Sequence, residues 1–227
     1  ANEQSGGSNG LMFDRQGMLI ACEHKERRVS RAVPGQPGTT IVSHYQDKKL
    51  NSPNDIWLDA NGGFYFTDPR YGKRDDLEQD KEAVYYVNGD GKITRIIDDL
   101  VRPNGIAMSP DGRLLYVIDH GPNMIYRYPV MIPGRIGKGG RIAHVNSPDG
   151  MTVGVKGRLF ITSRYGITVL DANGKWLGLM EVLEKPANCT FGGPGNRTLF
   201  ITAQTSLYGI DTLTHGWHVH LDGVPKK

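Results

Sequence analysis

Five polar residues that can supply oxygen ligands recur along the chain in one local setting. Each follows a small residue or proline and precedes an apolar alternation; they are Asn9, Asn54, Asn104, Asp149 and Asn188. Successive members are separated by roughly 40 to 50 residues, which is the length of a propeller blade. A radial repeat places equivalent residues around one axis. The pattern therefore predicts that separate parts of the sequence deliver a ring of oxygen donors to one point.

A ring of amide oxygens with one or two carboxylates suits a hard divalent cation, because Ca²⁺ takes oxygen ligands with tolerant geometry. The expected ligands are Asn54, Asn104 and Asp149. A cation there polarises a carbonyl or phosphoryl oxygen and lowers the pKa of a bound water, while Asp149 can take the proton. The chemistry would be hydrolysis without a covalent nucleophile. One alternative stays open, because Pro-Asn-Gly is also a turn signal and such Asn side chains can simply bond backbone groups.

Other catalytic and metal motifs are missing from the sequence. There is no phosphate-binding Gly-Lys-Ser/Thr loop and no His-Glu-x-x-His helix. The histidines His215, His218 and His220 could suggest zinc, because residues two apart in a strand share a face. A polar edge strand is the preferred interpretation, because no Cys or third ligand is spaced to complete the site. Cys22 and Cys189 give no disulfide framework and are expected to be small buried hydrophobes.

The elements that position these residues are predicted to be short antiparallel strands. The 30 glycines and 13 prolines suit many tight turns rather than long helices. The second strand of each repeat is expected at Met18–Cys22, Phe64–Thr67, Leu114–Ile118, Leu159–Thr162 and Leu199–Thr202, and one outer pair at Ala83–Val87 and Lys92–Ile97. The acidic stretch 74–80 is expected to be a solvated loop. The fold class is all-β, a single propeller domain over residues 1–227 with about five blades visible.

Antiparallel pairing adds a second set of candidates at the mouth of the channel. Because a tight turn joins the first two strands of a blade, the start of the first and the end of the second lie at the same end. The residues just past the second strands are Glu23, His24, Asp68, Arg70, Tyr71, Asp119, His120, Ser163, Arg164, Tyr165 and Gln204. Of these, His24, Asp68 and Arg164, together with Asn54, are predicted to bind substrate. A structural role remains the alternative for His24 and His120.

Charge and hydropathy exclude several partners. The net charge of +3 is small, and no basic stripe is interleaved with stacking aromatics, so nucleic acid is not expected. No apolar run reaches the roughly 18 residues of a membrane span, and no signal peptide opens the chain. We expect a soluble protein, cytoplasmic or periplasmic, that acts on a small molecule. The sequence does not indicate its oligomeric state.

Several motifs resemble those of one known family. They are Asn51-Ser52-Pro53-Asn54-Asp55, Tyr65-Phe66-Thr67-Asp68-Pro69, Arg102-Pro103-Asn104-Gly105 and Pro148-Asp149-Gly150-Met151, with blade-like stretches at 9–31 and 186–207. Together they resemble the SMP-30/gluconolactonase/luciferin-regenerating-enzyme family. The resemblance implies a six-bladed propeller with a divalent cation in its channel, most often Ca²⁺, with Zn²⁺, Mn²⁺ or Mg²⁺ as alternatives. It implies hydrolysis of sugar-acid lactones, and some relatives hydrolyse organophosphates.

The resemblance also assigns roles and raises one discrepancy. By motif, Asn104 and Asp149 correspond to metal ligands, Asp149 also to the residue that activates water, and Asn54 to a residue that binds metal or substrate. Family members also use a Glu in an early Glu-Gly-Pro segment, which is absent before Ser8. The chain is therefore expected to lack a first blade, or to close a smaller ring with its two ends. A gluconolactonase-like hydrolase is the leading hypothesis, and a non-catalytic scaffold or inactive truncated form is the alternative.

Overall fold

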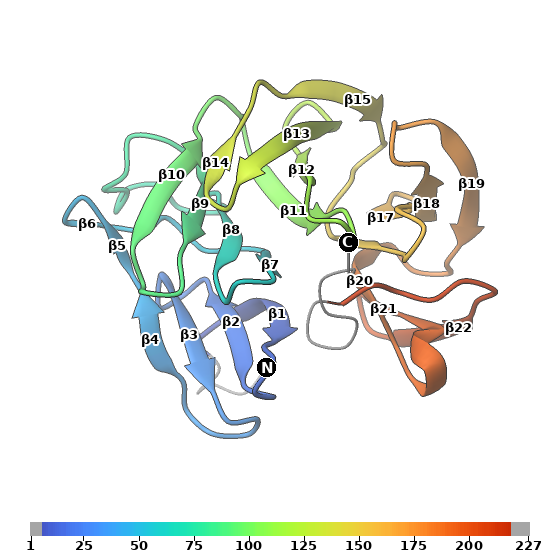
Figure 1. Ribbon diagram of the computed structural model, residues 1–227, viewed down its shortest axis with the longest axis horizontal. Coiled ribbons are helices and arrows are strands. Elements are labelled where there is room, and N and C mark those ends of the chain that lie inside the picture. The colour runs from blue at the N-terminus through green and yellow to red at the C-terminus, as the bar shows by residue number, and fades with distance from the viewer. Residues whose placement is uncertain (1–5, 219–227) are drawn as a thin grey trace.

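Five antiparallel sheets surround one axis in the computed structural model, which describes residues 6–218 (Figure 1). Blade 1 contains β1 (Ser8–Phe13), β2 (Leu19–Glu23), β3 (Arg28–Ala32) and β4 (Thr39–Val42). Blade 2 contains β7 (Ile56–Leu58), β8 (Phe64–Asp68), β9 (Ala83–Val87) and β10 (Ile93–Ile97). A small hairpin, β5 (His44–Tyr45) and β6 (Lys48–Lys49), lies between them in the sequence.

The remaining three blades follow in chain order. Blade 3 contains β11 (Pro103–Met108), β12 (Leu114–Asp119) and β13 (Met124–Ile132), with β14 (Arg135–Ile136) and β15 (Gly140–His144) both paired to β13. Blade 4 contains β16 (Met151–Val153), β17 (Leu159–Ser163), β18 (Gly166–Leu170) and β19 (Trp176–Glu181). Blade 5 contains β20 (Pro186–Gly192), β21 (Thr198–Ala203) and β22 (Leu207–Asp211), with the short 3₁₀ helix η2 (Pro194–Asn196) between β20 and β21.

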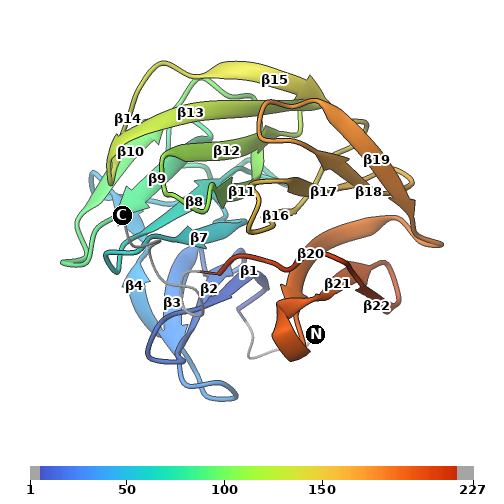
Figure 2. The same cartoon turned by 45° about the vertical axis from the view of Figure 1, so that its right-hand side comes forward.

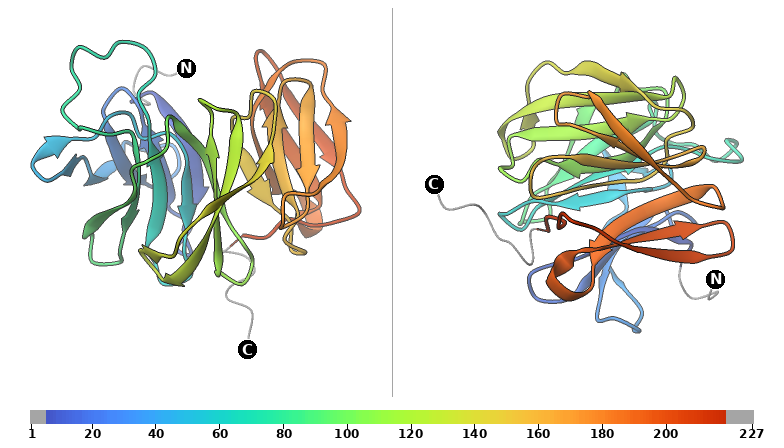
Figure 3. Two further views of the ribbon diagram at one scale, coloured as in Figure 1. Left: turned by 90° about the horizontal axis from the view of Figure 1, so that it is seen from above. Right: turned by 90° about the vertical axis from the view of Figure 1, so that its right-hand side faces the viewer.

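The first strand of each blade lines the axis. β1, β7, β11 and β20 lie nearest the centre of Figure 1, and Figure 2 shows β16 between β11 and β20. These inner strands contact one another in the order β1, β7, β11, β16, β20. Seen from above, the sheets stand side by side around the axis (Figure 3). The predicted all-β propeller with five visible blades is therefore confirmed.

The predicted strands agree closely with the observed ones. The expected second strands correspond to β2, β8, β12, β17 and β21, with ends that differ by at most one residue. The acidic stretch 74–80 contains no helix, as expected. It is more strongly tied down than a solvated loop, because Asp76 pairs with Arg70, and Asp80 lies 2.8 Å from Arg95.

Neighbouring blades meet at close range where their inner strands begin. The backbone N–H of Gly105 donates to the carbonyl of Asp149 at 2.9 Å, and that of Gly150 donates to Ala187 at the same distance. A Cβ atom added at Gly105 would lie 2.6 Å from the Asp149 carbonyl oxygen. No real Cβ tolerates such a distance, so glycine is required here by the approach of two backbones. The Asn-Gly and Asp-Gly pairs of the repeat are thus explained by packing.

The C-terminal part of the described chain crosses the other end of the inner strands. Gly216 pairs with Gly154, and Trp217 donates its backbone N–H to Val153 at 3.1 Å. The Trp217 ring stacks on Trp57 of β7, with centroids 6.4 Å apart and planes 11° from parallel. This segment fastens blade 2 to blade 4.

The expected polar edge strand around the C-terminal histidines is not what the structure shows. His218 is buried and its Nε2 lies 2.9 Å from the carbonyl oxygen of Phe191. The only pairing between residues 215 and 218 is the isolated bridge at Gly216. His220 lies outside the described residues. The segment packs against the inner strands instead of forming an edge strand, because Trp217 is buried there and His218 beside it is buried too.

We expect Trp217→Ala to destabilise the fold by about 3–5 kcal/mol, because it leaves a cavity beside Trp57. Trp176→Ala is the matched control, since that tryptophan is 64% exposed on β19 and its loss should change stability by about 0.5 kcal/mol or less. Urea denaturation followed by far-ultraviolet circular dichroism measures both. Equal stability losses in the two variants would show that the terminal segment does not hold the blades together.

Candidate active site at the channel mouth

Threonines at the ends of the second strands fix where the inner strands begin. The Thr67 hydroxyl accepts the backbone N–H of Asp55 at 3.1 Å, and the Thr162 hydroxyl accepts that of Gly150 at 2.9 Å. In blade 5, Thr202 accepts the N–H of Asn188 at 3.1 Å. These bonds tie the start of an inner strand to the end of its neighbour. The predicted mouth, with both strand ends at one end of the blade, is confirmed.

One corner of the mouth is formed by His24 and two asparagines. The His24 Nε2 atom lies 3.0 Å from Nδ2 of Asn9 and 3.4 Å from Nδ2 of Asn54. Burial, and secondarily the charge of Arg70, lower the pKa of His24. A neutral imidazole can therefore accept at Nε2 while both amides donate. Holding the Asn54 nitrogen on His24 fixes the direction of its Oδ1 atom, which has no hydrogen-bond partner within residues 6–218.

A second corner joins Tyr71, Asn104 and Asp149. The Nδ2 atom of Asn104 donates to the Tyr71 hydroxyl at 2.7 Å, and the Asn104 side chain also hydrogen-bonds the Asp149 carboxylate. Burial raises the pKa of Tyr71 well above its ordinary value, and the charge of Asp149 raises it further. The phenol therefore stays protonated. These three residues come from blades 2, 3 and 4, so the contact joins three consecutive blades.

Asp149 is a partly buried carboxylate whose pKa is raised, chiefly by burial. Its hydrogen bond with Asn104 opposes this shift, as do the charges of His120 and Lys185. His120 lies beside it, because its Nδ1 atom is 2.7 Å from the carbonyl oxygen of Pro148. A His120 Nδ1–H that donates there fixes the orientation of the ring beside Asp149.

These contacts follow one rule around the ring. A residue just past the second strand of a blade reaches the start of the inner strand in the next blade. His24 reaches Asn54, Tyr71 reaches Asn104, and His120 reaches Pro148. His24 was expected among the site residues from the sequence, whereas Tyr71 and His120 were placed at the mouth without a role. Their role depends on side-chain direction, which strand order alone does not give.

Asp55 is a buried carboxylate that the sequence argument passed over. Its two carboxylate oxygens accept the backbone N–H groups of Ile56 at 3.0 Å and Ile106 at 3.3 Å. Burial raises the pKa of Asp55 to about 7, and the side chain of Asn188 hydrogen-bonds it. A signal was present, because Asp55 stands where three of the other four repeats have glycine. Its carboxylate takes up the space at the axis and links blades 2, 3 and 5.

Two other predicted substrate-binding residues make different contacts. Asp68 is fully buried, and its oxygens accept the backbone N–H groups of Asn51 and Ser52, each at 2.7 Å. Its described contacts hold the loop before β7. Arg164 is exposed at the mouth end of β17, where its guanidinium lies 5.6 Å from the Tyr165 ring centroid. A role for Arg164 in binding substrate stays a prediction.

The donor set fits a hard cation in its chemistry. Asp149 supplies a carboxylate and Asn54 supplies a free amide oxygen, both of which Ca²⁺ accepts. Asn104 directs its nitrogen at Asp149, so its amide must turn for Oδ1 to join the same ion. Within residues 6–218 there is no group of three or more His, Cys, Asp or Glu side chains arranged to hold a metal. Amide oxygens would therefore be essential ligands.

Within the same residues, no helix is long and apolar enough to cross a membrane.

Comparison with known proteins identifies sequences that are similar to this chain. A family model described as SMP-30/Gluconolactonase/LRE-like region matches residues 2–205. A gluconolactonase from Zymomonas mobilis is 31% identical over 230 residues, which cover 92% of this chain and 64% of that protein. The chain thus spans less than two thirds of that relative's length. Lactonase drp35 from Staphylococcus saprophyticus is 30% identical over 171 residues, covering 55% of this chain and 52% of the relative.

Solved structures agree with the sequence match. A gluconolactonase from Xanthomonas campestris is similar with a TM-score of 0.84 and 33% identity, covering 90% of this chain and 71% of that chain. A calcium-binding protein, regucalcin from Agrobacterium tumefaciens, has a TM-score of 0.62 at 20% identity, with 88% and 82% covered, and shares the fold. The match over residues 2–205, at this identity and with this fold, shows that the chain belongs to the SMP-30/Gluconolactonase/LRE-like family.

Proposed function

We propose that this chain carries the active site of a lactone hydrolase that opens sugar-acid lactones with water. The observation that supports it most is the contact of Asn104 with both Tyr71 and Asp149, which brings three blades together around one raised-pKa carboxylate. The gluconolactonases among its relatives act on this class of substrate by name. We infer the reaction type from the residues of the site, and the substrate class from the names of the relatives.

Asp149 is the residue assigned to proton transfer. A water oxygen attacks the lactone carbonyl carbon, the ring C–O bond breaks, and the water proton passes through the Asp149 carboxylate to the leaving ring oxygen. The product is an open-chain hydroxy acid that holds both hydrogens of the water, so atoms and charge balance before the acid ionises. Burial suits Asp149 to this task, because it raises the pKa of the carboxyl and makes the carboxylate a stronger base.

Binding and orientation fall to the amides and His24. Asn9 and Asn54 are held by the His24 ring, so their remaining polar atoms keep fixed directions toward a bound sugar. Preset groups need no reorganisation when substrate arrives. Arg164 is proposed to contact the substrate from blade 4, where its side chain is exposed.

A divalent cation, most simply Ca²⁺, would be held by Asn54, Asn104 and Asp149. Once bound it would polarise the lactone carbonyl and stabilise negative charge on its oxygen. The Tyr71 hydroxyl supports this set, because a phenol both donates and accepts and so can restrain either end of the Asn104 amide.

Asp149→Asn should lower kcat/KM for glucono-δ-lactone by about a hundredfold or more, because the proposed base is lost. A pH-indicator assay of lactone opening measures it. Glu181→Gln is the matched control, since Glu181 is an exposed carboxylate on β19 of the same blade. Unchanged turnover in the Asp149 variant would remove Asp149 from the mechanism.

Tyr71→Phe should weaken Ca²⁺ binding about tenfold while leaving the fold intact, because residues that orient a metal ligand affect affinity by such factors. Calorimetric titration with Ca²⁺ is the measurement. Tyr165→Phe serves as control, because Tyr165 is 63% exposed at the same end of blade 4. The orienting role of Tyr71 is refuted if both variants bind Ca²⁺ as tightly as the parent chain.

A further inference from the structure

Arg102 is a cation beside the proposed active site that has no carboxylate partner in the described part of the chain. It immediately precedes β11 and lies two residues before Asn104. Its guanidinium carbon is 5.2 Å from the centroid of the Tyr71 ring, whose hydroxyl accepts from Asn104. Within residues 6–218 it has no ion-pair partner, and its Nε atom is buried without a hydrogen bond. One phenol ring therefore separates a free guanidinium from the reacting centre.

Three arginines of blades 1 and 2 are neutralised by carboxylates. Arg28 lies 2.7 Å from Glu23, Arg31 lies 2.6 Å from Asp14, and Arg70 pairs with Asp76. No carboxylate among the described residues neutralises Arg102, although these other guanidinium groups are neutralised, so the charge of Arg102 remains for an anionic ligand.

Two carboxylates in this part of the mouth are already engaged elsewhere. Both oxygens of Asp119 accept backbone N–H groups, one from Arg102 itself at 2.8 Å and one from Val101 at 3.0 Å. Asp149 hydrogen-bonds Asn104 and feels the charges of His120 and Lys185. Two positive charges thus act on this part of the mouth: Arg102 lies over Tyr71, and the charge of Lys185 acts on Asp149. The described residues supply no carboxylate that pairs with the Arg102 guanidinium.

We propose that Arg102, stacked on Tyr71, is a specificity-determining residue that binds an anionic group on the substrate. This inference rests on the proposed lactonase function and narrows its substrate to lactones that carry a carboxylate or a phosphate. A guanidinium binds either anion through paired N–H donors. Stacking on an aromatic face restrains the guanidinium plane and leaves its N–H edges available. The ester to be opened would lie at Asn104 and Asp149, and the anion would lie at Arg102.

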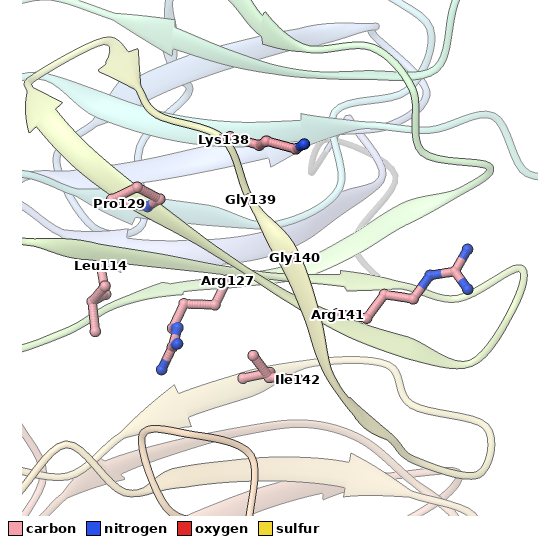
Figure 4. Close-up of a pocket in the computed structure, with 8 residues that line it drawn as sticks. All are labelled: Leu114, Arg127, Pro129, Lys138, Gly139, Gly140, Arg141 and Ile142. Carbon is pink, nitrogen blue, oxygen red and sulfur yellow. The ribbon is translucent and has the colours of Figure 1, made fainter.

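A similar pair elsewhere supplies a matched control. Arg141 lies over the ring of Tyr126 at 5.8 Å, on the outer edge of blade 3. It lines a surface pocket of about 480 Å³ together with Arg127 and Lys138 (Figure 4). Unlike Arg102, it donates its Nε–H, to the Tyr126 hydroxyl at 2.9 Å. The two arginines share the stacked geometry and differ in the unmet hydrogen bond and in their distance from the mouth.

The experiment compares kcat/KM for three lactones in the presence of Ca²⁺: neutral gluconolactone, glucarolactone with its carboxylate, and phosphogluconolactone with its phosphate. In Arg102→Gln, the preference for an anionic over the neutral lactone should fall about tenfold or more, mainly through KM, because a charged hydrogen bond is lost. Arg102→Lys should restore part of the preference, and Arg141→Gln should leave it unchanged. The anion whose preference falls further identifies the group that Arg102 recognises.

A binding measurement separates this inference from the proposed function. Calorimetry with glucarate and phosphogluconate, which need no hydrolysis, should show weaker binding to Arg102→Gln than to the parent chain. If no lactone is opened but this difference is found, the proposed function fails and the anion subsite stands. Equal anion binding, an unaltered lactone preference in Arg102→Gln, or the same loss in Arg141→Gln would overturn the inference.

Discussion

The close approach of inner strands at the mouth is the constraint on which the rest of the structure depends. The 2.9 Å bond from Gly105 to the Asp149 carbonyl sets blades 3 and 4 at a distance that only glycine permits. Because the backbones are this close, side chains on consecutive blades meet across the axis. Asn104 can reach Asp149, and Tyr71 can reach Asn104, without long or flexible side chains. The site is thus a consequence of how the blades pack.

The same packing creates the electrostatic character of the channel. Asp55 and Asp68 are carboxylates without solvent around them, and burial raises the pKa of each to about 7. Their oxygens are satisfied by backbone N–H groups, so they act as clamps between strands and loops. Asp149 differs because it stays partly exposed, and its neighbours are side chains that a ligand can displace or join. Burial and partner type therefore separate the two structural carboxylates from Asp149, the residue proposed to react.

Repetition made most of the fold predictable from the sequence. The Asn/Asp repeats located the inner strands, and hairpin turns located the second strands to within one residue. Antiparallel pairing placed His24 and Tyr71 at the mouth before any contact was known. What could not be predicted was side-chain direction: Asp68 turns into the protein to bond Asn51 and Ser52, whereas Tyr71 reaches Asn104 in the next blade. The contact between Trp217 and Trp57 joins residues that are far apart in the sequence. No local sequence pattern predicts such a contact.

The central claim is that oxygen donors from three blades converge on one hard cation. It is tested most directly by anomalous diffraction from crystals grown with Mn²⁺ in place of Ca²⁺. We expect an anomalous peak at the mouth with oxygen atoms of Asn54, Asn104 and Asp149 as ligands, at roughly the 2.0–2.6 Å that hard cations require. A peak away from these residues, or a saturated crystal with no peak at the mouth, would contradict the account.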